Sequence, residues 1–122
     1  MLMRIKKLLE RNAIYIAVIL TIFVTFISLV SLKGVVKVKV ENSDKIGHFL
    51  AYFTLGVVWL YALKNKHKKV LIIFFLILYG IIIEILQGVL TSNRQADFYD
   101  FIANTTGVLL AYVLTTKLSF LQ

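Results

Sequence analysis

Long uncharged stretches constrain the fold of this 122-residue chain more than any other feature. A helix needs about 20 largely apolar residues to cross roughly 30 Å of hydrocarbon, because each residue advances it by about 1.5 Å. Four stretches approach or exceed that length, at about residues 13–32, 46–63, 70–90 and 98–118. The sequence therefore predicts an all-α polytopic membrane protein, a bundle of four transmembrane helices.

The composition indicates the same class. Apolar residues make up 60% of the chain and charged residues only 16%, whereas soluble domains are usually about half apolar and a quarter charged. A mean hydropathy of +0.88 excludes an ordinary water-soluble globule and a disordered tail. Because cysteine is absent, disulfides, thiolate metal sites and a cysteine nucleophile are excluded as well. We expect one membrane domain over residues 1–122.

The net charge of +8 predicts an orientation in the membrane. Basic residues beside a span tend to stay in the cytoplasm. Nine of the 14 lie in residues 4–11 and 64–69 and at Lys117, against five in residues 33–45 and at Arg94. Both termini of this multi-pass cell-membrane protein are therefore expected in the cytoplasm. No nucleic-acid partner is expected, because most aromatic residues lie within the apolar stretches rather than beside a basic surface.

Polar residues recur on one face of three predicted helices, near the ends expected to face outward. In the second stretch, Asp44, His48 and Tyr52 are spaced four apart and so share a helix face. Counting inward from the outer boundary at about 1.5 Å per residue predicts a layer of Tyr52, Glu84 and Asn104 about 9 Å deep. A second group is expected directly above this layer, namely His48, Gln87 and Asp100. A third group is expected at the mouth, namely Asp44, Lys45, Arg94 and Asp97. The pattern predicts a polar pocket that opens outward.

Glu84 is the polar residue that packing explains least well. A buried acid in a membrane span costs roughly 2.5–3.5 kcal/mol unless it is paired or hydrated, and its candidate partners are His48 and Arg94. Asn104 also fits an interhelical hydrogen bond, and the aspartates near helix starts fit caps. Glycines such as Gly107 suit close helix packing or self-association, which leaves a homo-oligomer open.

The order of these polar residues resembles the two motifs of the VanZ-like membrane proteins. The first motif is the run of residues 44–49, followed by Tyr52, Leu55 and Gly56. The second contains Glu84, Gln87, Arg94, Asp97, Asp100, Asn104 and Gly107. The resemblance covers about residues 44–111 and implies a small polytopic protein of the bacterial cell envelope. The founding relative is linked to resistance to teicoplanin, a glycopeptide antibiotic, and only the resemblance connects this chain to resistance.

Four functions fit these residues. One is the binding or modification of an envelope lipid or lipid-linked cell-wall precursor, with Arg94 and Lys45 holding a phosphate and Glu84 and His48 orienting the polar group or moving a proton. Another is metal-assisted hydrolysis or transfer, in which the acids and His48 hold a divalent cation such as Mg²⁺. Ion transport is a third, disfavoured by the apolar inner halves of the spans. The fourth is a structural scaffold.

The sequence leaves open whether the protein is an enzyme, and it shows no spacing typical of a metal site, so no cofactor is required. Membrane lipids are the expected partners. The candidate catalytic residues are Glu84, His48 and Asp100. The candidate ligand-binding residues are Arg94, Asn104, Lys45, Asp44, Gln87, Asp97 and Tyr52.

Overall fold

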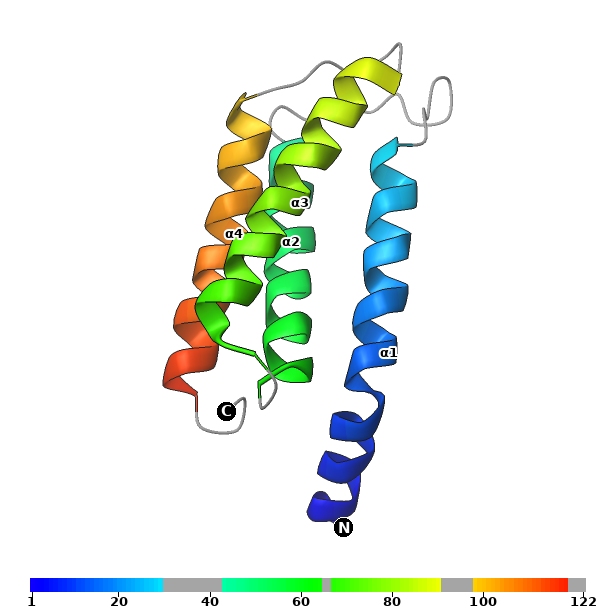
Figure 1. Ribbon diagram of the computed structural model, residues 1–122, viewed down its shortest axis with the longest axis vertical. Coiled ribbons are helices and arrows are strands. Elements are labelled where there is room, and N and C mark those ends of the chain that lie inside the picture. The colour runs from blue at the N-terminus through cyan, green and yellow to red at the C-terminus, as the bar shows by residue number, and fades with distance from the viewer. Residues whose placement is uncertain (30–42, 65–66, 91–97, 119–122) are drawn as a thin grey trace.

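The computed structural model describes residues 1–29, 43–64, 67–90 and 98–118, and there the protein is all-helical, without strands. Its four helices, drawn in Figure 1, are α1 (Leu2–Leu29), α2 (Ser43–Ala62), α3 (Lys69–Leu90) and α4 (Phe98–Lys117). The start of α1 and the end of α4 lie toward the same end of the molecule. The beginning of α2, the end of α3 and the beginning of α4 therefore lie at the opposite end.

Helices α2, α3 and α4 fall close to the predicted stretches, whereas α1 extends beyond the first predicted stretch at its N-terminal end. That stretch begins near residue 13, and α1 begins at Leu2. The basic segment before residue 13 consists largely of Leu, Lys, Arg and Glu, which favour helix. Apolarity marks only the part of a helix suited to hydrocarbon, so it does not locate where the helix begins. The predicted end at residue 32 lies outside the described residues.

The closest helix pair is α2 and α4, and small residues bring their backbones together. A Cβ atom at Gly107 would lie 2.5 Å from the carbonyl oxygen of Phe49 and 2.8 Å from the amide nitrogen of Phe53. A Cβ atom at Gly56 would lie 2.6 Å from the Cβ of Ala111. Both glycines are buried between α2 and α4, so they serve packing within the chain.

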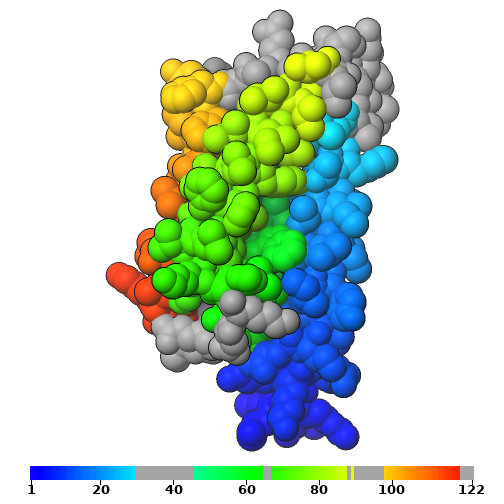
Figure 2. All heavy atoms as spheres, viewed as in Figure 1, coloured from blue at the N-terminus to red at the C-terminus, as the bar shows by residue number. Residues whose placement is uncertain are grey.

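Helix α1 packs at the edge of the bundle, against α2 and α3 (Figure 1). Ala13 and Ala17 are buried in this contact, being 4% and 0% exposed. The first part of α1 is joined to the turn after α2 by an ion pair between Glu10 and Lys64, with 3.1 Å between the charged atoms. In Figure 2, α1 and α3 lie side by side on the visible face.

Large apolar side chains cover much of the outer surface. Phe26, Val70 and Phe74 are each more than half exposed, and exposed apolar surface on this scale is typical of contact with lipid or another protein. Two helical segments, Leu2–Leu29 and Lys69–Gln87, are long and apolar enough to cross a membrane. Residues Ile46–Ala62 of α2 form a shorter apolar helix. These features are consistent with a membrane protein.

Candidate functional site

The structure brings together three predicted site residues from three helices. His48 of α2, Glu84 of α3 and Asp100 of α4 each offer one nitrogen or oxygen atom, and these atoms all lie within 4.8 Å of one another. Glu84 and Asp100 are each only 6% exposed, while His48 is partly exposed. We refer to these three residues as the His–acid cluster. Their chemical roles stay a prediction.

The helix directions explain this convergence. Residues 48 and 100 lie in the first turns of α2 and α4, and residue 84 lies in the last turns of α3. Because these three helix segments meet at one end of the bundle (Figure 1), the polar residues lie at a similar height along the bundle axis. The cluster therefore lies at the end of the bundle opposite the start of α1.

A second polar layer lies one helical turn deeper. Tyr52 and Asn104 follow His48 and Asp100 by four residues, and Gly80 precedes Glu84 by four, so each pair shares a helix face. A Cβ atom at Gly80 would lie 3.2 Å from the Tyr52 ring and 3.6 Å from the amide nitrogen of Asn104. The glycine thus makes room for these side chains, which are 1% and 2% exposed.

Several polar atoms of this deeper layer are buried without a protein hydrogen bond. Among the described residues, the hydroxyl of Tyr52 and both amide atoms of Asn104 have no hydrogen-bond partner. Leaving a buried polar group unsatisfied costs about 1–3 kcal/mol, so apolar side chains would stabilise this position better. The layer is chemically suited to water or to a polar ligand.

Gln87 has a structural contact in addition to its predicted ligand-binding role. Its amide nitrogen donates a hydrogen bond of 2.9 Å to the carbonyl oxygen of Ser28. The side chain is 2% exposed. This bond joins α3 to the end of α1 beside the His–acid cluster.

The predicted rim of the pocket lies outside the described part of the structure. Arg94 and Asp97 fall in the segment 91–97, which is not described. Asp44 and Lys45 belong to α2, but their side chains are not described. The predicted pairing of Glu84 with Arg94 therefore stays a prediction.

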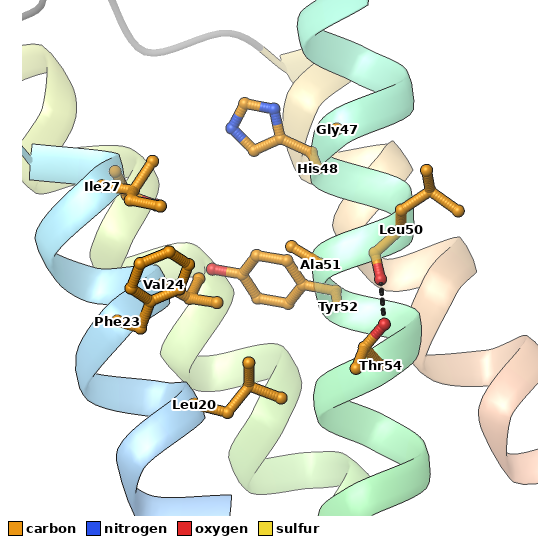
Figure 3. Close-up of a pocket in the computed structure, with 11 residues that line it drawn as sticks. Leu20, Phe23, Val24, Ile27, Gly47, His48, Leu50, Ala51, Tyr52 and Thr54 are labelled. Atoms are coloured by element: carbon orange, nitrogen blue, oxygen red, sulfur yellow. Dashed lines mark hydrogen bonds between the residues drawn. The ribbon is translucent and has the colours of Figure 1, made fainter.

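An apolar groove between α1 and α2 reaches the His–acid cluster. It has a volume of about 440 Å³, and His48 and Tyr52 form part of its wall. In Figure 3 the hydroxyl of Tyr52 points across the groove toward α1. The opposite wall belongs to α1 and consists of Ser28 and four apolar residues, namely Leu20, Phe23, Val24 and Ile27.

A second cavity of about 470 Å³ lies between the same two helices, farther from the cluster. Ile16 of this cavity precedes Leu20 of the first by four residues, and Val58 follows Thr54 by four. The two cavities therefore follow one face of each helix. We call them together the α1–α2 groove.

Sequence reasoning missed an interhelical hydrogen-bond network on the other side of α1. The indole nitrogen of Trp59 donates to the Thr21 hydroxyl at 2.8 Å. The hydroxyls of Thr25 and Tyr79 form a hydrogen bond with each other. Buried Trp and Tyr side chains usually have hydrogen-bond partners. This preference is the one signal in the sequence that could have indicated hydrogen bonds from Trp59 and Tyr79 to another helix. The network fixes α1 to α2 and α3.

The fold and the site define an all-helical protein with membrane-type helices and a buried His–acid centre at one end. The chain belongs to the VanZ/LLP1 family, whose model matches residues 3–120. The predicted family is thereby confirmed, and the match also includes α1, beyond the residues 44–111 that carried the resemblance. No curated protein and no solved structure matches the chain.

Proposed function

We propose that this protein is a multi-pass membrane protein of the bacterial cell envelope that binds an envelope lipid or lipid-linked glycan. The polar part of the ligand occupies the His–acid cluster, and its hydrocarbon chain lies in the α1–α2 groove. The observation that supports this proposal best is the position of His48, which belongs to both the polar cluster and the apolar groove. An amphiphilic ligand matches that combination of surfaces.

The polar chemistry suits a lipid headgroup. Glu84 and Asp100 accept hydrogen bonds from hydroxyl or amine groups, and charge-assisted bonds of this kind are stronger than neutral ones. Arg94 and Lys45 would hold a phosphate at the rim, because the arginine fork binds phosphate through two parallel bonds. The deeper layer of Tyr52 and Asn104 would receive a further hydroxyl group.

The dimensions of the groove suit a hydrocarbon chain. Its α2 wall extends from Gly47 to Tyr61, which corresponds to about 21 Å at 1.5 Å per residue. The hydrocarbon of one leaflet is about 15 Å thick. The two cavities together thus extend along the helices over a distance that matches the hydrocarbon chain of an outer-leaflet lipid.

The orientation belongs to the same proposal. All four helices cross the membrane, with both termini in the cytoplasm and the His–acid cluster near the outer surface. This follows from the concentration of basic residues in 4–11 and 64–69. The family resemblance adds the proposal that this member contributes to teicoplanin resistance.

A second candidate function is a membrane hydrolase or transferase that acts on a phosphate or sugar ester of such a lipid. The observation that favours it is the proximity of one imidazole and two carboxylates, a set that can move protons or hold a metal ion. Turnover of a lipid-phosphate substrate by the purified protein would distinguish this candidate from binding alone.

Photo-crosslinking tests the binding proposal. The chain is reconstituted in vesicles of bacterial lipid that contain a lipid with a photoreactive acyl chain, and labelled peptides are mapped by mass spectrometry. We expect labelling of the α1 and α2 segments that line the groove. Glu84→Gln should reduce it about tenfold, as expected for losing a hydrogen bond to a charged group.

Glu10→Gln is the matched control, because Glu10 is a partly exposed acid far from the cluster, paired with Lys64. This variant should be labelled like the unmodified chain. Equal labelling of folded Glu84→Gln and Glu10→Gln would contradict the lipid-binding proposal and favour a structural role for the cluster.

A further inference from the structure

The His–acid cluster has the composition of a metal site as well as of a hydrogen-bonding site. One imidazole and two carboxylates come from three different helices, and one ligand atom of each lies within 4.8 Å of the others. Two atoms that each bind a metal at about 2.1 Å are at most about 4.2 Å apart. The spacing of these atoms is therefore close to the spacing that a single bound ion requires.

Electrostatics favour a cation at this position. Glu84 and Asp100 are both buried, at 6% exposed. Two carboxylates this close repel each other unless a proton or a cation lies between them. A divalent cation bound by both carboxylates would lower the repulsion between them.

Asn104 provides an independent observation in favour of a ligand. It is 2% exposed, and among the described residues neither atom of its amide has a hydrogen-bond partner. It lies one turn below Asp100 on the same face of α4. Its amide nitrogen is 3.6 Å from the Cβ position of Gly80, one turn below Glu84. The amide thus faces α3 directly beneath the cluster, where a metal-bound water would satisfy it.

We propose that His48, Glu84 and Asp100 bind a divalent cation, with Asn104 accepting a hydrogen bond from a water on that ion. Imidazole suits Zn²⁺ and carboxylates suit Mn²⁺ and Mg²⁺, so the mixed set predicts tighter binding of Zn²⁺ or Mn²⁺ than of Mg²⁺. This inference deepens the proposed function by supplying an ion at the same site, and it does not require that a lipid bind.

Metal binding is measured on the full chain, purified in detergent without a polyhistidine tag. After treatment with EDTA and its removal, the protein is titrated with Zn²⁺, Mn²⁺ or Mg²⁺, and bound metal is counted by elemental mass spectrometry. We expect about one ion per chain, with each of Glu84→Gln, Asp100→Asn and His48→Gln lowering the affinity at least about tenfold. Bound Mn²⁺ also gives an electron paramagnetic resonance signal that changes when a ligand is lost.

Two control variants remove similar groups elsewhere. His67→Gln removes the exposed histidine between α2 and α3, and Glu10→Gln removes an acid of α1. Both should bind metal like the unmodified chain. The proposal is overturned if the unmodified chain retains none of the three ions, or if a control variant loses the ion while the folded cluster variants keep it.

The two proposals fail separately. Metal binding without groove labelling would contradict only the lipid proposal, whereas groove labelling by a metal-free protein would contradict only the metal site. Because the unmodified chain is tested directly, a cluster variant that does not fold still leaves the metal inference open to refutation.

Discussion

Gly107 and Gly56 determine how closely α2 and α4 approach each other. The atoms nearest to a Cβ added at Gly107 belong to the backbone of α2. A backbone segment within a helix cannot shift alone, so the whole helix would have to move. The position of His48 relative to Asp100 therefore depends on a glycine that takes no part in the chemistry.

Replacement of this glycine tests the dependence. Gly107→Ala should destabilise the protein by about 1–3 kcal/mol, the usual range for overpacking, and should lower the midpoint of thermal unfolding followed by circular dichroism in detergent. Gly47→Ala is the control, because in the described part of the structure no atom outside its own stretch of helix lies within 4 Å of the added Cβ. Equal stability of the two variants would show that α2 and α4 are packed less tightly at Gly107 than the structure indicates.

Single residues were predictable where their chemistry conflicts with a membrane. Glu84 stood out because an acid in an apolar stretch is costly, and the structure places it close to His48, one of its two predicted partners. The sequence predicted Glu84 in the layer of Tyr52 and Asn104, whereas its carboxylate lies with His48 and Asp100. Trp59 carries no such conflict, because an aromatic residue in a span is ordinary. Its hydrogen bond to Thr21 depends on how α1 is rotated against α2. That rotation cannot be predicted from the sequence.

At the scale of elements, the helices are joined by two kinds of contact. Helices α2 and α4 meet through small residues with close backbones. Helix α1 buries Ala13 and Ala17 and is also attached through side-chain hydrogen bonds such as that from Gln87 to Ser28. Interhelical hydrogen bonds in membranes contribute about 0.6 kcal/mol each on average. We therefore expect α1 to separate from the bundle more readily than α2 separates from α4.

The register of α3 against α4 is testable by a disulfide. The Cβ position of Gly80 lies 3.6 Å from the Cβ of Asn104, within the range of about 3.5–4.5 Å found in disulfides. Gly80→Cys combined with Asn104→Cys should form an intramolecular bond under mild oxidation, detected by mass spectrometry and by loss of thiol labelling. The chain has no cysteine of its own, so no background bond interferes.

Gly47→Cys combined with Asn104→Cys is the control pair, because no atom of another described helix lies within 4 Å of the Cβ position of Gly47. It should keep both thiols free under the same oxidation. Crosslinking of the control pair but not of the Gly80 pair would show a different register.

For the whole molecule, the proposed orientation predicts which positions are accessible from outside the cell. A membrane-impermeant maleimide added to intact cells should label Phe98→Cys, at the exposed start of α4. Leu2→Cys and Lys117→Cys, near the two termini, should react only after the membrane is permeabilised. Labelling of Leu2→Cys in intact cells would contradict cytoplasmic termini.

The sequence by itself determined the helices, the family and the identity of the polar residues. Apolar stretches predict helices because their length must match hydrocarbon, and polar residues within them are conspicuous because hydrocarbon cannot hydrate them. Only the tertiary structure decided that His48 belongs to both the cluster and the α1–α2 groove. How each helix is rotated about its own axis depends on the packing of many similar apolar side chains. No single residue in the sequence specifies that rotation.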